Sequence, residues 1–177
     1  MRIEREHTAA LIVDFQERLV PAIADHEALM ERVRILLRGL KALEIPMTVT
    51  QQYTKGLGMS VPEVWEASGE TEYLDKISFS ALEVAEPKIH DKKYILVCGM
   101  EAHCCVLQTV IDLAGAGYVP VLVTDCIGSR RESDREMAIS RAEQEGAVLT
   151  SSEAILFELL KEAGTPLSKE ILKIVKQ

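Results

Sequence analysis

Two adjacent cysteines, Cys104 and Cys105, follow an apolar run that stops at Gly99, in the segment VCGMEAHCCV. A helical pattern begins there. In the first turn of a helix, unpaired backbone N–H groups and the helix dipole favour a thiolate and can stabilise a developing oxyanion. A nucleophilic sulfur is therefore one interpretation. An inert pair is the other, because free cysteine is among the most buried residue types. The spacing alone favours neither sulfur.

Asp14 and Lys76 are charged residues with apolar neighbours. Asp14 ends the run LIVD, so we expect its carboxylate to be partly shielded from water. Shielding costs free energy unless the charge is paired, and it raises the pKa of a carboxylate, as a general base needs. Capping the next turn is the simpler role for Asp14. Lys76, in DKISFS, is either a solvated lysine or one that is partly buried by the apolar residues after it.

The composition restricts the possible partners of the 177-residue chain. A net charge of −8 argues against a nucleic acid or an anionic membrane as partner, because both bind basic surfaces. No apolar run approaches a membrane span, and the charged start MRIEREHTAA differs from a signal peptide. These features predict a cytoplasmic protein with four reduced cysteines. No C-x-x-C or H-E-x-x-H spacing indicates a metal.

Short apolar runs alternate with longer helical patterns along the chain. The expected strands are 8–15, 46–52, 93–99, 118–126 and 146–151, and the expected helices are 26–44, 102–117 and 133–146. Continuous apolarity is typical of parallel strands covered on both faces. The pattern predicts one domain, 1–177, of α/β class: three layers, α/β/α, around a mostly parallel, doubly wound sheet. Ligands bind at the carboxyl ends of such strands, where Asp14 and the cysteine pair would lie.

Two further segments raise specific expectations. The irregular stretch 53–92 is long for a compact fold, and such stretches are usually functional. The terminal segment PLSKEILKIVKQ is expected to form an amphipathic helix that docks on its own domain or on a neighbouring subunit.

Three motifs taken together resemble the isochorismatase-like superfamily of cysteine hydrolases over nearly the whole chain. They are LIVDFQ with Asp14, KISFS with Lys76, and GMEAHCCV with Cys105 six residues after Gly99. The segments TQQYTKGLGMSVPE, GMEAHCCVLQTVIDL and DCIGSRRESDR are most similar to those of isochorismatase domain-containing proteins. The resemblance implies that Cys105 is the nucleophile and Cys104 its apolar neighbour.

The resemblance also implies a mechanism and an assembly. Asp14 would take the thiol proton, and Lys76 would keep Asp14 charged and support the Cys105 thiolate, which attacks an amide or carbamoyl carbonyl of a small molecule. The thioester would then be hydrolysed by water, without a cofactor. The N–H groups of Glu101 and Cys105 would form the oxyanion hole beside a cis Met100–Glu101 peptide. Family relatives are commonly oligomers, so we expect a homo-oligomer. The candidate substrate-binding residues are Phe15, Gln51, Tyr53, Phe79 and Ile127.

The chain also departs from some relatives. Metal-dependent nicotinamidases of the superfamily carry an Asp-x-His pair where this chain has Gln51 and Tyr53, so no metal site is expected. Cleavage of isochorismate, a vinyl ether, needs no sulfur nucleophile, so the retained cysteine argues against that substrate. A doubly wound nucleotide carrier is disfavoured because DFQERLVP contains no glycine-rich loop. A catalytically idle scaffold or small-molecule-binding protein of the same fold remains the alternative.

Two conspicuous side chains have open roles. His103 lies two residues before Cys105, and residues at that spacing on a helix face apart, so we assign His103 to the start of the helix. Trp65 is expected to be either a lid over the pocket or an anchor in an interface.

Overall fold

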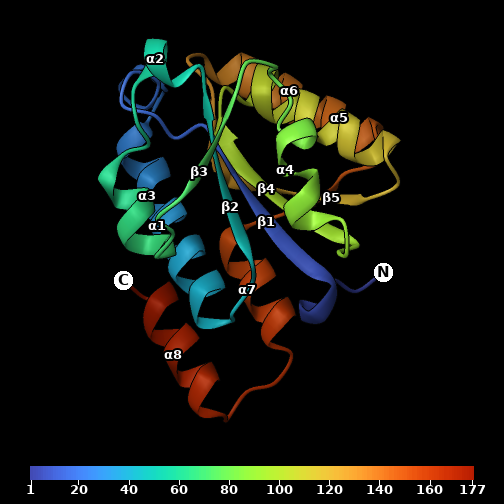
Figure 1. The fold of residues 1–177 in the computed structure, drawn as a ribbon. Coiled ribbons are helices and arrows are strands. Elements are labelled where there is room, and N and C mark those ends of the chain that lie inside the picture. The colour runs from blue at the N-terminus through green and yellow to red at the C-terminus, as the bar shows by residue number, and fades with distance from the viewer.

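The fold is built on a six-stranded, wholly parallel sheet with the order β3-β2-β1-β4-β5-β6 (Figure 1). The structure is a computed structural model that describes residues 1–177. The strands are β1 (Thr8–Val13), β2 (Met47–Gln52), β3 (Tyr73–Lys76), β4 (Tyr94–Met100), β5 (Val119–Gly128) and β6 (Val148–Thr150). Strands are added in one direction from β1 to β3 and in the other from β4 to β6, so the strand order reverses between β1 and β4. Ligands bind at the carboxyl ends of the strands beside such a reversal.

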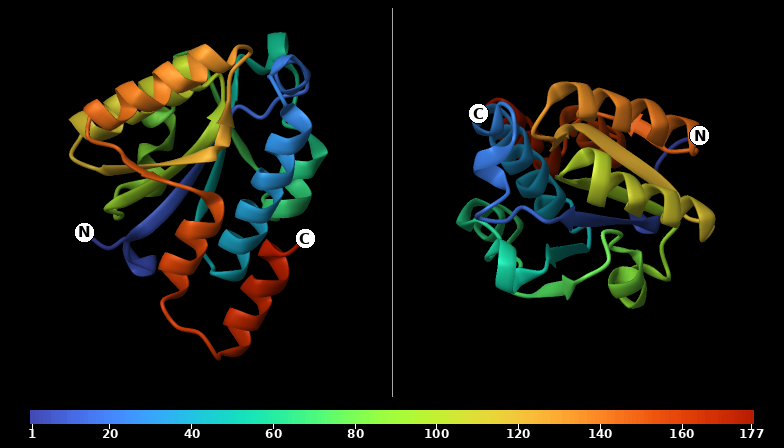
Figure 2. Two further views of the ribbon diagram at one scale, coloured as in Figure 1. Left: turned by 180° about the vertical axis from the view of Figure 1, so that it is seen from behind. Right: turned by 90° about the horizontal axis from the view of Figure 1, so that it is seen from above.

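Helices cover both faces of this sheet (Figures 1 and 2). One face is packed by α1 (His26–Ala42), α3 (Pro62–Ser68), α7 (Ser152–Leu160) and α8 (Pro166–Val175), and the other by α4 (Leu82–Ile89), α5 (Leu107–Gly115) and α6 (Glu132–Gln144). The shorter helices are η1 (Arg5–His7), η2 (Val20–Ala22), α2 (Thr54–Leu57) and the π-helix η3 (Ala102–Val106). The predicted three-layer, doubly wound architecture is confirmed.

Burial explains why the central strands could be recognised. Every residue of β1 and of β4 is buried, as expected for strands covered on both faces. All five predicted strands are present. The irregular stretch 53–92 holds α2, α3, β3 and α4. Strand β3 was not predicted, because its sequence YLDK lies at the sheet edge and only its last residue is buried.

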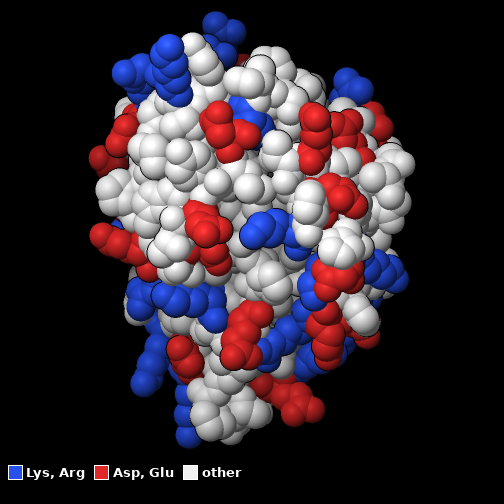
Figure 3. All heavy atoms as spheres, viewed as in Figure 1, with Lys and Arg blue, Asp and Glu red and all other residues white.

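The C-terminal helix docks on its own domain. Ile171 and Ile174 of α8 are buried in the core beneath α1. None of the helices combines the length and the apolar character that crossing a membrane requires. On the face drawn in Figure 3, acidic and basic side chains are interspersed, and no continuous basic stripe crosses it.

Candidate active site

A buried ion pair joins the carboxyl ends of β1 and β3. Asp14 follows β1 directly and has a left-handed backbone conformation, with φ 59°. Its Oδ2 accepts a hydrogen bond of 2.7 Å from Lys76 Nζ, and its Oδ1 accepts one of 2.9 Å from Thr50 Oγ1. Neither charged side chain is exposed to solvent. The structure thus brings together two of the three residues that the sequence assigned to catalysis.

The Lys76 ammonium has further hydrogen-bond acceptors. Its Nζ donates to Gln52 Oε1 at 2.7 Å and to the carbonyl of Phe79 at 2.8 Å, besides Asp14. Three short hydrogen bonds match the three protons of an ammonium group, so Lys76 is held as a fixed positive charge. Gln52 is itself oriented by Gln16, whose Oε1 accepts from the Gln52 backbone N–H at 2.7 Å. Sequence reasoning missed Gln52 because it placed Lys76 in irregular chain, whereas Gln52 and Lys76 are register partners in β2 and β3.

Cys105 lies in the π-helix η3, which begins two residues after β4. Its exposed fraction is 4%, whereas Cys104 is half-buried. The carbonyl of Cys105 accepts from Thr109 Oγ1 at 2.7 Å, and the same hydroxyl accepts from the backbone N–H of Ala81 at 2.9 Å. Thr109 therefore connects the cysteine to the segment that follows Lys76.

The surroundings of Cys105 favour the neutral thiol over the thiolate. Burial raises the pKa of the Cys105 thiol well above its usual value, and the charge of the nearby Asp14 carboxylate raises it further. The Lys76 charge lowers the pKa but does not offset these effects. This direction is opposite to the lowered pKa that the sequence predicted. The expectation counted the helix terminus and Lys76 but not the desolvation of the sulfur, and Lys76 is already paired with Asp14.

Glu101 connects β4 to the π-helix. The predicted cis bond between Met100 and Glu101 is wrong, because the chain contains no cis peptide. The turn is made by Glu101 itself, in the left-handed conformation with φ 56° and ψ 64°. Glu101 belongs to neither a helix nor a strand, and its backbone N–H donates no hydrogen bond to another backbone group. This N–H is therefore available to a ligand.

The other predicted pocket residues fall into two groups. Phe15 and Gln51 are fully buried, and Gln51 Oε1 accepts from the backbone N–H of Ser60 at 2.8 Å, so both support the site's framework. Tyr53 and Phe79 are each 50% exposed. They flank Lys76, since the Tyr53 N–H donates to the Lys76 carbonyl at 2.8 Å and the Phe79 carbonyl accepts from Nζ.

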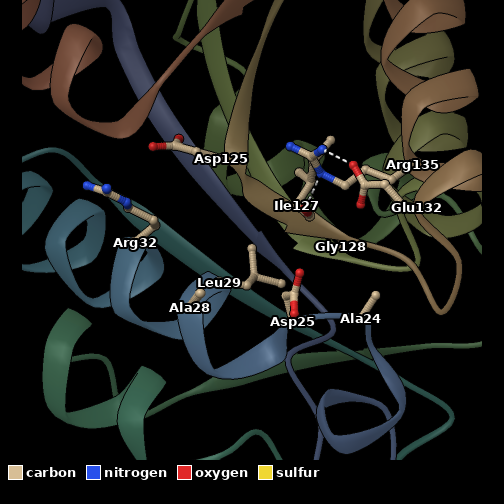
Figure 4. A pocket seen from close by; sticks show the side chains of 10 residues that line it. All are labelled: Ala24, Asp25, Ala28, Leu29, Arg32, Asp125, Ile127, Gly128, Glu132 and Arg135. Carbon is tan, nitrogen blue, oxygen red and sulfur yellow. Dashed lines mark hydrogen bonds and ion pairs between the residues drawn. The ribbon is translucent and has the colours of Figure 1, made fainter.

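Ile127, the last predicted pocket residue, lines a cavity of about 310 Å³ between the start of α1, the end of β5 and the start of α6 (Figure 4). The lining residues are Ala24, Asp25, Ala28, Leu29, Arg32, Asp125, Ile127, Gly128, Glu132 and Arg135. Asp14, Lys76 and Cys105 are absent from this lining, although Ile127 and Cys105 belong to one packed cluster of the core. Several of its charges have partners in the protein: Asp125 accepts from Ser152, and Arg135 pairs with Glu132 at 2.7 Å.

His103 and Trp65 have protein partners of their own. The Nδ1 of His103 lies 3.0 Å from Ser129 Oγ and 3.4 Å from Glu101 Oε2, so its interactions are with these groups. The indole N–H of Trp65 donates to the carbonyl of Ser60 at 3.0 Å, and the ring packs on the core beside α1. No three His, Cys, Asp or Glu side chains converge as a metal site requires.

Comparisons with known proteins agree with this architecture. Residues 8–154 match the sequence model of the Isochorismatase domain. Isochorismatase domain-containing protein 2 of Xenopus laevis is 35% identical over 180 residues, which cover 99% of this chain and 87% of the relative. The solved MAR1 ribonuclease of Caenorhabditis elegans superposes with a TM-score of 0.94 at 35% identity, covering 100% of this chain and 93% of that one. The YcaC gene product of Escherichia coli, an octameric hydrolase of unknown specificity, superposes with a TM-score of 0.85 at 25% identity, covering 92% of this chain and 83% of that one.

Proposed function

This chain belongs to the isochorismatase family, and we propose that it is a cysteine hydrolase that cleaves a C–N bond, an amide or a carbamoyl, in a small molecule. The observation that carries the proposal is the buried Asp14–Lys76 ion pair beside the thiol of Cys105. A buried ion pair costs desolvation free energy and is weak evidence for stability alone. A buried acid, base and sulfur together are what covalent hydrolysis requires.

The proposed reaction begins with a proton transfer. As the Cys105 sulfur bonds to the substrate carbonyl carbon, its proton moves to Asp14, and the C=O electron pair moves to the oxygen. Because the resting thiol has a raised pKa, deprotonation accompanies attack instead of preceding it. Asp14 then gives the proton to the departing nitrogen, the amine or ammonia leaves, and a thioester remains. Water hydrolyses the thioester with Asp14 as base and restores the thiol.

Lys76 and Glu101 have the charge-balancing roles in this proposal. When Asp14 becomes neutral, the Lys76 charge remains and offsets the new negative charge on the carbonyl oxygen. The N–H of Glu101, which has no protein acceptor, and that of Cys105 would donate to that oxygen. One positive and one negative charge are then present in the site throughout the reaction.

The access to the sulfur and the surrounding aromatic groups favour a small substrate. Cys105 is only 4% exposed, so a bulky chain could not reach it without rearrangement. Tyr53 and Phe79, each half exposed beside Lys76, would contact the substrate, and Phe15 and Gln51 would shape the wall behind it. Ile127 lines a cavity that none of the three proposed catalytic side chains lines, so it would contribute indirectly. No cofactor enters the proposed reaction.

Self-association and a cytoplasmic location are part of the proposal. The E. coli neighbour is octameric, and this chain exposes Ile77 by 71% beside Tyr53 and Phe79. A second copy covering these side chains would remove apolar surface from water. Light scattering coupled to size-exclusion chromatography would measure the oligomeric state. A monomer at micromolar concentration would contradict this part of the proposal.

The decisive experiment is mass spectrometry of the intact protein after incubation with a library of small amides and carbamoyl compounds. An adduct on Cys105 that Cys105→Ala abolishes and Cys104→Ala retains would support the hydrolase. The absence of any adduct or turnover, with a bound compound detected by native mass spectrometry, would favour the idle binding protein. An adduct that persists in Cys105→Ala would overturn the assignment of the nucleophile.

The name of the C. elegans neighbour suggests RNA as a further substrate to test. The net charge of −8 and the interspersed charges on the face drawn in Figure 3 disfavour a polyanion. We expect no cleavage of a labelled RNA above the background of Cys105→Ala. Cleavage that depends on Cys105 would contradict the small-molecule assignment.

A further inference from the structure

Glu101 has a backbone conformation that its residue type disfavours. The left-handed region costs a non-glycine residue roughly 1–3 kcal/mol, and it persists only where the surroundings determine it. Glu101 is the single residue between β4 and the π-helix that carries Cys105. The conformation of this one residue therefore decides how the π-helix leaves the sheet.

The Glu101 side chain is bound by two neighbouring segments. Its Oε1 accepts a hydrogen bond of 2.9 Å from Arg130 Nε, in the connection between β5 and α6. Its Oε2 lies 3.4 Å from His103 Nδ1 in the π-helix, and that ring nitrogen lies 3.0 Å from Ser129 Oγ. The residue is 8% exposed, and Oε2 has no geometrically good hydrogen bond, so Arg130 is its main partner.

We propose that Arg130 is a positioning residue for the oxyanion hole, acting through its ion pair with the Glu101 carboxylate. The pair stabilises the left-handed conformation in which the Glu101 N–H has no protein acceptor and is available to the substrate oxygen. This inference rests on the proposed function, in which that N–H stabilises the oxyanion. Arg130 itself does not touch the reacting atoms.

The inference can be tested without the natural substrate by comparing two reagents on the same sulfur. With p-nitrophenyl acetate, the Cys105 proton goes to Asp14, the sulfur bonds to the carbonyl carbon, and negative charge develops on the carbonyl oxygen before p-nitrophenolate leaves. With iodoacetamide, the sulfur displaces iodide from a methylene carbon, and no charge develops on the carbonyl oxygen. Only acetylation needs the oxyanion hole.

In the full-length protein we expect Arg130→Met to slow Cys105 acetylation by about tenfold or more, because one oxyanion donor is worth at least that in rate. Alkylation by iodoacetamide should change less than about twofold, since it needs no such donor. Arg130→Lys should restore part of the acetylation rate. Arg131→Met is the matched control, because the neighbouring Arg131 is exposed, as Arg130 is, but its side chain makes no hydrogen bond or ion pair.

A second pair of variants separates backbone conformation from side-chain charge. Glycine adopts positive φ without cost, so Glu101→Gly should acetylate faster than Glu101→Ala, which loses the ion pair and keeps the steric cost. Equal rates for these two variants, an unchanged acetylation rate in Arg130→Met, or an equal loss with both reagents would overturn the inference. A wild-type Cys105 that iodoacetamide labels but p-nitrophenyl acetate does not would contradict the proposed function, and this inference with it.

Discussion

Lys76 Nζ lies 2.7 Å from Asp14 Oδ2, and both side chains are fully buried. Because each charge compensates the other away from water, the loss of either one leaves an unpaired buried charge. Lys76→Met should therefore lower the free energy of unfolding by about 3–5 kcal/mol. Urea denaturation measures the change. Combining Lys76→Met with Asp14→Asn should recover part of the lost stability, since the unpaired carboxylate charge of Asp14 is then removed.

The matched control for this prediction is an exposed pair. Arg34 and Glu31 lie 3.0 Å apart with about half of each side chain exposed, so Arg34→Met should change the free energy of unfolding by less than about 1 kcal/mol. A Lys76→Met protein as stable as Arg34→Met would show that the buried pair is not ionised.

The pH dependence of Cys105 alkylation follows from its environment. Burial and the Asp14 carboxylate raise the pKa of the Cys105 thiol, so its thiolate is scarce at neutral pH. Iodoacetamide should label Cys105 more slowly than free cysteine at pH 7.5, and the rate should still rise with pH above pH 9. Peptide mass spectrometry measures Cys105 separately from Cys104. A rate that is independent of pH between 6 and 9 would indicate a preformed thiolate instead.

Asp14→Asn should speed the same alkylation at neutral pH. The substitution removes a negative charge that raises the pKa of the Cys105 thiol and leaves the Lys76 charge in need of a partner. The thiolate then becomes that partner, while the proton acceptor for acyl transfer is lost. Faster alkylation together with slower acetylation by p-nitrophenyl acetate would support Asp14 as the base that accepts the thiol proton. Slower alkylation would contradict it.

Alkaline pH should destabilise the fold through its buried thiols. Burial raises the pKa of Cys98 to about 12 and that of Cys126 well above its usual value. Above pH 9, the unfolded thiols lose their protons while the folded ones keep them, so the free energy of unfolding falls as pH rises. Each such thiol contributes a slope of up to about 1.4 kcal/mol per pH unit, until pH passes the folded pKa.

The control for the alkaline prediction removes one thiol and keeps similar volume. Cys98→Val should reduce the steepness of the decline between pH 9 and pH 11, measured by urea denaturation at each pH, because the decline contributed by this thiol disappears. Other groups that titrate in this range are common to both proteins and cancel in the difference. Identical slopes in the two proteins would contradict the raised pKa.

The sequence was sufficient for those features that depend on local patterns. The apolar runs of β1 and β4 determined the parallel sheet, and the positions of Asp14 and Cys105 after them determined the edge where the site lies. Strand β3 could not be predicted, because its pairing with β2 compensates for a polar sequence. Lys76 entered the site only through family resemblance, since nothing in DKISFS specifies a partner 62 positions away.

Properties that depend on distances in the fold were predicted less well. The sequence predicted a lowered pKa for the Cys105 thiol, whereas its surroundings raise it. The direction depends on how deeply the sulfur is buried and on how near Asp14 lies. The turn at Glu101 was expected to need a cis bond, whereas a left-handed residue makes it. The hydrogen bond from Arg130 that accompanies this turn connects residues 29 positions apart, and no local pattern indicates it.

Thr109 provides the last prediction, because one hydroxyl connects the two halves of the proposed site. It donates to the Cys105 carbonyl and accepts from the Ala81 N–H, just beyond the Phe79 carbonyl that binds Lys76. Thr109→Val keeps the shape but leaves the buried Ala81 N–H without an acceptor, which costs about 1–3 kcal/mol of stability. Because the lysine segment and the cysteine segment are then no longer joined, acetylation of Cys105 should slow as well. Thr109→Ser retains the hydroxyl and should restore the acetylation rate. If packing of the methyl group mattered instead of the hydroxyl, Thr109→Ser would be no faster than Thr109→Val.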